Sequence, residues 1–271
     1  NLKEVNGQDP EALLVVEFSG GDARRLVEKL RSLRRPLWIA ESAESQKKVW
    51  DVRKVGLGIL MSRPGKTKPV SFIEDTAVPV NQLGEFVHEM MKMIHEFGTT
   101  AEFYAHASAG CLHIRPLLNL QSSQGVAALR AIAERTVELT LRYGGSVSAE
   151  HGDGLARSEW LVRTYGPEIV QAFYELKGAA DPKGLLNPGK IVNPPKMDSN
   201  LRYGENYQPV AWAPVFHYPG EEKARSESGL IEAIEQCNGA GVCRKLEGVM
   251  CPSFQTSQEE MHSTRGRANL L

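Results

Sequence analysis

Two histidines and a glutamate–histidine pair have the residue types needed to bind a metal ion and move a proton. His106 and His113 are seven residues apart, and the small residues 107–110 follow the first of them. On one helix the two would lie two turns apart, about 10 Å, and on one strand they would point to opposite faces. If the small residues make a turn between two strands, both imidazoles can converge. The strand-like residues on either side favour that interpretation.

The second unusual cluster is the run Glu150-His151-Gly152-Asp153-Gly154, which packs three ionisable groups into a glycine-bracketed loop. Two histidines and one glutamate are a known ligand set for a catalytic metal with an open position. His151 could then act as a base, because imidazole titrates near neutral pH. The alternative for the strand histidines is a structural role, and Asp153 is expected to be a hydrogen-bonding loop residue. Cys111 is expected to be a small buried apolar residue.

Three of the four cysteines fall within fifteen residues: Cys237, Cys243 and Cys251, the last followed by Pro252. Clustered thiolates suit zinc or an iron–sulfur cluster. The spacing departs from the C-x2-C-x2-C-x3-C-P run of bacterial ferredoxins, and three cysteines cannot complete a four-thiolate site. Two interpretations of the cysteines are therefore possible. Either a fourth ligand lies beyond Leu271, or the three cysteines share no site.

The composition excludes several classes of protein. The chain of 271 residues is 41% hydrophobic and 24% charged, and its net charge of -1 argues against nucleic-acid binding through bulk charge. No stretch reaches the roughly 18 apolar residues that a membrane span needs. Residues 1–20 lack the basic start and apolar core of a signal peptide. We therefore expect a cytoplasmic protein, either free or peripheral to a membrane.

The elements that must position these residues follow from the apolar periodicity. Helices are expected at residues 22–33, 45–61, 81–97, 122–143, 158–165, 167–178, 228–236 and from 256 onward. Strands are expected at residues 12–18, 36–40, 71–78, 102–106 and 112–117. These strands lack the long apolar runs of a parallel sheet, so the pattern predicts an α+β fold, an antiparallel sheet with helices packed on one face. Without a G-x-G-x-x-G or P-loop motif, no nucleotide-binding βαβ unit is expected.

The chain divides into three parts. Residues 1–192 carry the α+β pattern. Four prolines between residues 181 and 195, and aromatic residues without a period after them, predict an extended connector over residues 193–227. Residues 228–271 form a small helical segment that bears the three clustered cysteines.

The order of the motifs resembles one family. The motifs are Glu74-Asp75-Thr76-Ala77-Val78-Pro79, His106-x6-His113 with Ile114-Arg115-Pro116, the run at residues 150–154, and Leu186-Asn187-Pro188-Gly189-Lys190-Ile191. Together they resemble the C-terminal substrate domain, ferredoxin-like in fold, of FAD-linked oxidases of the vanillyl-alcohol-oxidase type. Residues 237–269 resemble the start of the 4Fe-4S domain fused to the branch that contains D-lactate and D-2-hydroxyglutarate dehydrogenases.

The resemblance implies cofactors and residue roles. FAD would be bound mainly by an upstream domain, and the second half of the iron–sulfur region would lie downstream. A divalent metal, often zinc, would be held by His106, His113 and Glu150, with His151 as the base. Trp50-x-x-Arg53 matches the pattern that supplies the arginine for the substrate carboxylate, with Arg115 as a helper. Asn187 would lie towards the flavin, and Cys237, Cys243 and Cys251 would bind the partial 4Fe-4S cluster.

The function that follows is the oxidation of a D-2-hydroxyacid, of the D-lactate or D-2-hydroxyglutarate class, to the 2-oxoacid. Hydride would pass to FAD and electrons to iron–sulfur clusters and an unknown acceptor. These 271 residues alone are expected to be inactive, because the flavin domain lies elsewhere. The alternatives are a non-catalytic metal-binding or docking module, and an alcohol or aldehyde oxidase on the same scaffold, which would not need Arg53.

Overall fold

The computed structural model describes residues 12–33, 35–61, 63–208, 215–216, 218 and 229–271. The chain separates into two compact units, residues 1–59 and 60–271. The first unit holds helix α2 (Ala23–Arg31) and most of α3 (Ala43–Met61). The strands predicted at residues 12–18 and 36–40 were wrong, because both segments are irregular and most of their side chains are exposed. A strand requires a neighbouring strand to pair with its backbone, and neither segment pairs with one.

The second unit contains an antiparallel sheet of four strands: β1 (Lys68–Pro69), β2 (Thr76–Ala77), β3 (Ala101–His106) and β4 (Cys111–Leu118). β3 pairs with β4 along its whole length, from Ala101 opposite Pro116 to His106 opposite Cys111. β1 and β2 pair with opposite ends of β4. The strand predicted over residues 71–78 is therefore confirmed only at its end, since residues 72–75 form a bend and a turn before β2.

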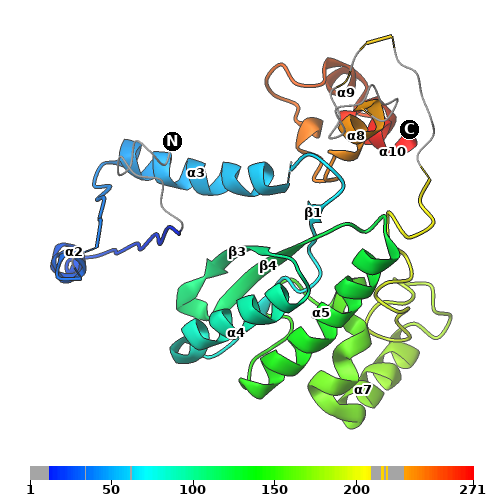
Figure 1. The fold of residues 1–271 in the computed structure, drawn as a ribbon, viewed down its shortest axis with the longest axis horizontal. Coiled ribbons are helices and arrows are strands. Elements are labelled where there is room, and N and C mark those ends of the chain that lie inside the picture. Colours follow the sequence, from blue (N-terminus) through cyan, green and yellow to red (C-terminus); the bar gives the residue numbers. More distant parts are fainter. Residues whose placement is uncertain (1–11, 34, 62, 209–214, 217, 219–228) are drawn as a thin grey trace. The chain divides into compact units, whose positions relative to one another are not determined.

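Two helices supply the apolar layer that covers one face of this sheet, α4 (Leu83–Glu96) and α5 (Ser123–Arg142) (Figure 1). Alternate residues of β4 point towards them, because successive side chains of a strand lie on opposite faces. The buried core that results contains residues of all three elements: Phe86, Met90, Ile94, Leu112, Ile114, Leu118, Leu129, Ile132 and Val137. The α+β fold with helices on one face of the sheet is confirmed.

Local signals set the ends of these helices. The hydroxyl of Ser122 accepts the backbone N–H of Gly125 and so caps the start of α5. Gly98 follows α4 and Gly144 follows α5, both with positive φ, as is usual after a helix. After α5 the chain returns to the sheet, where Ser146 bridges to Ala77 of β2. That return brings residues 148–151 beside Asp75, at the end of β2 away from the β3–β4 turn.

Helix α6 (Gly154–Arg157), a 3-10 turn (Ser158–Trp160) and α7 (Leu161–Ala180) follow. The helix predicted at 158–165 begins as this 3-10 turn and continues in α7. The helix predicted at 167–178 also lies in α7, after non-helical backbone at Gly166. Residues 181–208, which include the first part of the connector predicted at 193–227, hold neither helix nor strand. Much of the rest of the connector lies outside the described residues.

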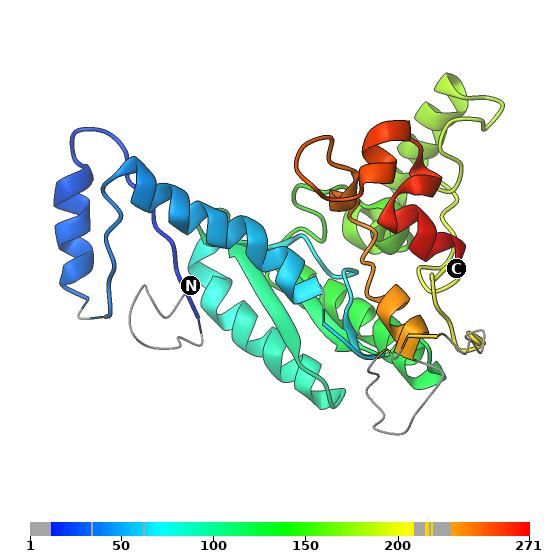
Figure 2. The same ribbon diagram turned by 90° about the horizontal axis from the view of Figure 1, so that it is seen from above.

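The cysteine-bearing part is made of short helices, α8 (Gly229–Glu235), α9 (Pro252–Ser257) and α10 (Thr264–Leu270), with single 3-10 turns between them. Figure 2 shows the chain entering these orange and red helices after the irregular yellow segment. Glu235 of α8 accepts hydrogen bonds from Gln121 (3.0 Å) and Tyr207 (2.7 Å). Across the described parts of the chain, no helix has both the length and the apolar content to cross a bilayer.

Candidate metal and active site

The hairpin brings His106 and His113 to the face of the sheet opposite α4 and α5. His106 pairs with Cys111 across the two strands, and Tyr104 pairs with His113. The Nε2 atoms of the two histidines lie 3.2 Å and 3.3 Å from the same oxygen, Oε1 of Glu150. The convergence predicted from a turn between two strands is therefore present.

His151 completes a cluster of three imidazoles around Glu150. Its ring stacks on that of His113, with centroids 5.0 Å apart, and its Nε2 lies 3.6 Å from Glu150 Oε1. The His113 side chain is only 4% exposed, whereas those of Glu150 and His151 are 47% and 42% exposed. The cluster thus has a buried floor and a side that a small molecule can reach.

A second carboxylate, Glu74, lies behind the imidazoles. Its Oε1 is 3.9 Å from Nδ1 of His113 and 3.8 Å from Nδ1 of His151. The buried guanidinium of Arg115 binds both Glu74 oxygens, Nη2 to Oε1 at 2.7 Å and Nε to Oε2 at 3.1 Å. Arg115 was predicted to help bind a substrate carboxylate; in the structure its guanidinium pairs with Glu74. No residue spacing predicts a role for Glu74, and its only signal in the sequence is its place in the motif of residues 74–79.

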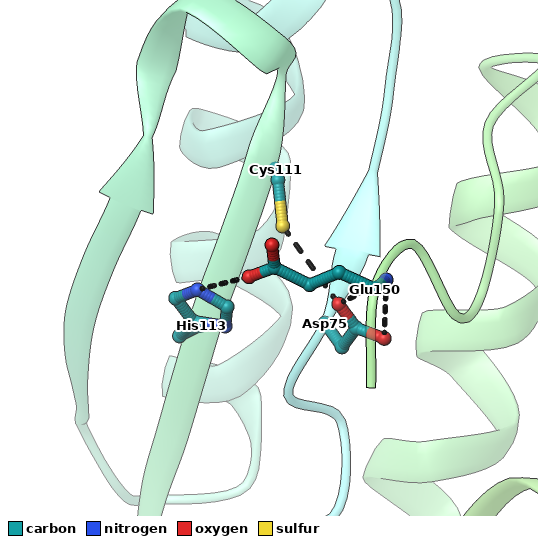
Figure 3. Close-up of side chains that lie close together, drawn as sticks. All are labelled: Asp75, Cys111, His113 and Glu150. Carbon is teal, nitrogen blue, oxygen red and sulfur yellow. Dashed lines mark hydrogen bonds and ion pairs between the residues drawn. The ribbon is translucent and has the colours of Figure 1, made fainter. Parts of the chain in front are cut away.

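Asp75, also without a role in the sequence analysis, is fully buried beside the glutamate–histidine loop (Figure 3). Its carboxylate accepts the Ser148 hydroxyl (2.8 Å) and backbone N–H groups of residues 149–151 (2.8 to 3.0 Å). Burial opposes ionisation of Asp75, but the backbone N–H groups of His151 and Glu150 outweigh it and hold the pKa of the carboxyl below its usual value. Asp75 is therefore an ionised anchor for the loop.

The residues of this cluster differ in their fitness to hold a metal. Two groups of side chains within the described residues have candidate ligand atoms within 4.8 Å of one another: Asp75, Cys111, His113 and Glu150, and Glu74, His113 and His151. The Asp75 oxygens are already occupied by N–H and O–H donors. Burial and the Asp75 charge raise the pKa of the Cys111 thiol to about 11, so the thiol stays protonated and is a poor ligand. Both oxygens of Glu74 already accept hydrogen bonds from Arg115, so Glu74 is also a poor candidate ligand.

The imidazoles of His106 and His113 and the Glu150 carboxylate fit a divalent metal better. Both Nε2 atoms lie beside Glu150 Oε1, although these three side chains are not among the groups of described residues whose ligand atoms all lie within 4.8 Å of one another. Burial, helped by the neighbouring imidazoles and opposed by Glu74, lowers the pKa of His113 and favours the neutral ring that binds metals. His113 Nδ1 has no hydrogen-bond partner and faces Glu74, as in the carboxylate–histidine pairs behind many metal ligands.

Two other predicted residues lie on different elements. Arg53 is exposed on α3 in the unit of residues 1–59, and its guanidinium lies 5.6 Å from the centre of the Trp50 ring. This contact reflects their i,i+3 spacing on one helix face. Asn187 is exposed in the loop after α7, where its φ is 45°. The Asp181 carboxylate accepts the backbone N–H groups of residues 185 and 186 and so shapes that loop.

The three clustered cysteines are half-buried and free of disulfides. Cys237 follows α8, Cys243 lies in a 3-10 turn and Cys251 precedes α9. The backbone N–H of Arg265 donates to Cys243 Sγ at 3.4 Å. Burial opposes ionisation of Cys251, but the Thr264 hydroxyl and neighbouring N–H groups lower the pKa of its thiol. Within the described residues, the three sulfurs are not among the groups whose ligand atoms all lie within 4.8 Å of one another.

The helix-covered antiparallel sheet, with ionisable side chains gathered on its other face, defines a class of protein. Residues 2–191 match the family of FAD linked oxidases, C-terminal domain, and the chain belongs to that family.

Curated relatives give more particular names. The chain is 32% identical to a D-2-hydroxyglutarate dehydrogenase of Pseudomonas putida and 29% identical to one of Escherichia coli, in both cases over 100% of this chain. It is 28% identical, over 59% of its length, to the mitochondrial D-lactate dehydrogenase (cytochrome) 1 of Saccharomyces cerevisiae. The matches cover 28%, 27% and 27% of these relatives, so the chain spans about a quarter of their length.

Proposed function

We propose that this chain is part of an FAD-dependent dehydrogenase that oxidises a D-2-hydroxyacid to the 2-oxoacid. The observation that carries the proposal is the convergence of His106 and His113 on Glu150, with His151 at the open side of the cluster. The family membership supports the use of FAD, and the names of the relatives support a substrate of the D-2-hydroxyglutarate or D-lactate class.

In this proposal His106, His113 and Glu150 hold a divalent metal, with zinc favoured by the two imidazoles and one carboxylate. A bound divalent ion acts as a Lewis acid, which lowers the pKa of a hydroxyl oxygen beside it. The protein contributes the geometry: the buried imidazole of His113 is fixed, and the half-exposed Glu150 leaves one side open to the substrate.

His151 is proposed as the base that takes the hydroxyl proton while hydride leaves Cα for the flavin. Its half-exposed side chain can meet a substrate, and Nδ1 faces Glu74 at 3.8 Å. Nε2, the other ring nitrogen, is the atom that would take the proton. Hydride and proton together account for the two hydrogens that the alcohol loses.

Three further roles complete the proposal. Arg53 binds the substrate carboxylate, for which a planar guanidinium is suited. Arg115 is proposed to act through Glu74, since its guanidinium already binds both oxygens of that carboxylate. Asn187 would be the residue of this chain on the side of the flavin, and Cys237, Cys243 and Cys251 would help to hold a 4Fe-4S cluster, which would supply electron transfer to an acceptor.

The proposal is tested by replacing the base in the full-length protein. His151→Ala should slow flavin reduction by D-2-hydroxyglutarate and D-lactate by about 10²- to 10⁴-fold, the usual contribution of a general base. Stopped-flow absorbance of the flavin measures this rate under anaerobic conditions. His95→Ala, which alters an exposed histidine on α4, is the control and should leave the rate unchanged. An undiminished rate in His151→Ala would remove its role as the base.

A further inference from the structure

Asp75 combines complete burial with an unusual backbone conformation. Its φ is 86°, in the region that favours glycine, yet its side chain is larger than that of glycine and 0% exposed. A non-glycine residue in this region is uncommon and costs conformational energy. Such a conformation persists only where surrounding contacts stabilise it, so the contacts of Asp75 are where its role should be sought.

The side-chain contacts of Asp75 all reach the loop that bears Glu150 and His151, apart from a weak approach by a thiol. Oδ2 accepts the Ser148 hydroxyl (2.8 Å) and the backbone N–H groups of residues 149 (2.9 Å), 150 (3.0 Å) and 151 (2.8 Å). Oδ1 accepts the N–H of Glu150 at 2.9 Å and lies 3.9 Å from Cys111 Sγ. A carboxylate so occupied has little capacity left to bind a metal directly.

The backbone of Asp75 ties the same loop to the strand that bears His113. Its N–H donates to the carbonyl of Leu112 at 3.0 Å, and its carbonyl accepts the N–H of Ala149 at 2.9 Å. Leu112 directly precedes His113 in β4. One residue therefore connects two elements that are more than 30 residues apart in the sequence and that each bring a group to the same point (Figure 3).

A second tie holds the far side of the loop. The buried guanidinium of Arg157 donates to the carbonyl of Glu74 at 2.7 Å and to that of Gly152 at 2.5 Å. The loop is thus fixed at both ends to residues 74 and 75. The Glu150 side chain is half exposed, so the position of its carboxylate depends chiefly on where the backbone of residue 150 is held.

We propose that Asp75 is a positioning residue of the metal site: its carboxylate holds the backbone of residues 148–151 so that Glu150 meets the imidazoles of His106 and His113. This inference rests on the metal site of the proposed function. It adds a residue that binds neither metal nor substrate and that acts only through the loop.

Asp75→Asn is the most direct variant, because it keeps the size of the side chain and asparagine tolerates positive φ. The amide nitrogen would replace one acceptor oxygen with a donor, so N–H groups of the loop would face an N–H group. Ser148→Ala removes a single donor to Asp75 and is the milder second variant. Ile132→Ala, which opens a cavity in the core on the other face of the sheet, is the control for lost stability alone.

The experiment measures zinc affinity in the full-length protein by competition with a chelator. The relevant zinc is that bound by the wild type and lost in His113→Ala. Asp75→Asn should weaken it by about 10- to 100-fold, the usual effect of losing a residue that orients a metal ligand. Ser148→Ala should weaken it less, and Ile132→Ala should lower the unfolding temperature with the affinity unchanged.

The outcomes separate this inference from the proposed function. If the wild type binds no zinc that depends on His113, the metal site itself is overturned. If that zinc is present but Asp75→Asn and Ser148→Ala bind it as tightly as the wild type, the positioning role alone is overturned. The positioning role would also be overturned if Ile132→Ala, at the same loss of stability, weakened zinc binding as much as Asp75→Asn does. If Asp75→Asn does not fold, Ser148→Ala decides, with a reduced affinity in support and an unchanged one against.

Discussion

Glu74 places a negative charge behind two imidazoles in a part of the protein that water barely reaches. Its side chain is 15% exposed, and Arg115, buried more deeply, binds both of its oxygens. A buried charge is costly unless it is paired, so this pair allows a carboxylate to remain beside His113 and His151. At the scale of single residues, the charge of the site depends on an arginine that touches no histidine in the contacts described.

Removing that arginine should therefore destabilise the folded protein. Arg115→Ala should lower the free energy of unfolding by about 3–5 kcal/mol, the range for breaking a buried ion pair, because Glu74 would lose its partner. Urea denaturation of the full-length protein measures the change. Arg135→Ala breaks a half-exposed pair with Glu96 and should cost about 0–1 kcal/mol. Equal losses in the two variants would contradict the importance of the buried pair.

At the scale of elements, the β3–β4 hairpin decides where His106 and His113 meet. Its turn ends at Gly110, whose φ is 68° and whose carbonyl accepts the N–H of Val78 at 3.0 Å. A Cβ at this position would lie 1.9 Å from the carbonyl oxygen of Val78. The close approach of the two backbones therefore requires glycine, and it ties the turn to the segment that follows β2.

Gly110→Ala should disturb this hairpin more than the same change at a matched glycine. Gly98 has nearly the same φ, 69°, but no heavy atom lies within 4 Å of its added Cβ. Both variants should lose about 1–2 kcal/mol through left-handed strain. Gly110→Ala should lose about 1–3 kcal/mol more through overpacking, and it should also weaken zinc binding. Urea denaturation and a zinc titration of the two variants check this, and equal effects would refute the role of the close approach.

The elements that could be predicted from the sequence are those in which a regular spacing of apolar residues continues over many positions. The apolar spacing of α4 and α5, and the small residues between two strand-like runs, predicted the helices and the hairpin. The apolar segment at residues 12–18 is not a strand, and an apolar run by itself does not reveal whether a partner strand exists. The turn at residues 74–75 was missed because positive φ at an aspartate has no signature in residue spacing.

At the scale of the whole molecule, the family match ends at residue 191, and the three clustered cysteines lie beyond it. They occupy separate turns and helix ends of a part made of short helices. Burial opposes ionisation of Cys251, but the Thr264 hydroxyl and nearby N–H groups lower the pKa of its thiol and favour the thiolate, the form that binds metals and iron–sulfur clusters. A redox role for the C-terminal part is therefore a proposal that rests on the three cysteines and their spacing.

Elemental analysis of the full-length protein tests that role. Cys237→Ser, Cys243→Ser and Cys251→Ser should each lower the content of iron and acid-labile sulfide and leave bound FAD unchanged. Cys111→Ser is the matched control and should keep the iron content, because Cys111 is buried in the sheet. Zinc bound by the three cysteines in place of iron would favour a structural metal site and contradict the prediction.

The sequence by itself determined the residue types of the candidate ligands and the order of the motifs. It also determined the hairpin and the helices, because their residue spacing repeats within one segment. The tertiary structure decided which side chains support them. Glu74 meets Arg115 across about 40 positions, and Asp75 meets residues 148–151 across more than 70. Such pairs have no periodicity along the chain, because they depend on how the loop after α5 returns to the sheet. The candidate ligands were therefore visible in the sequence, whereas the residues that hold them became visible only in the folded chain.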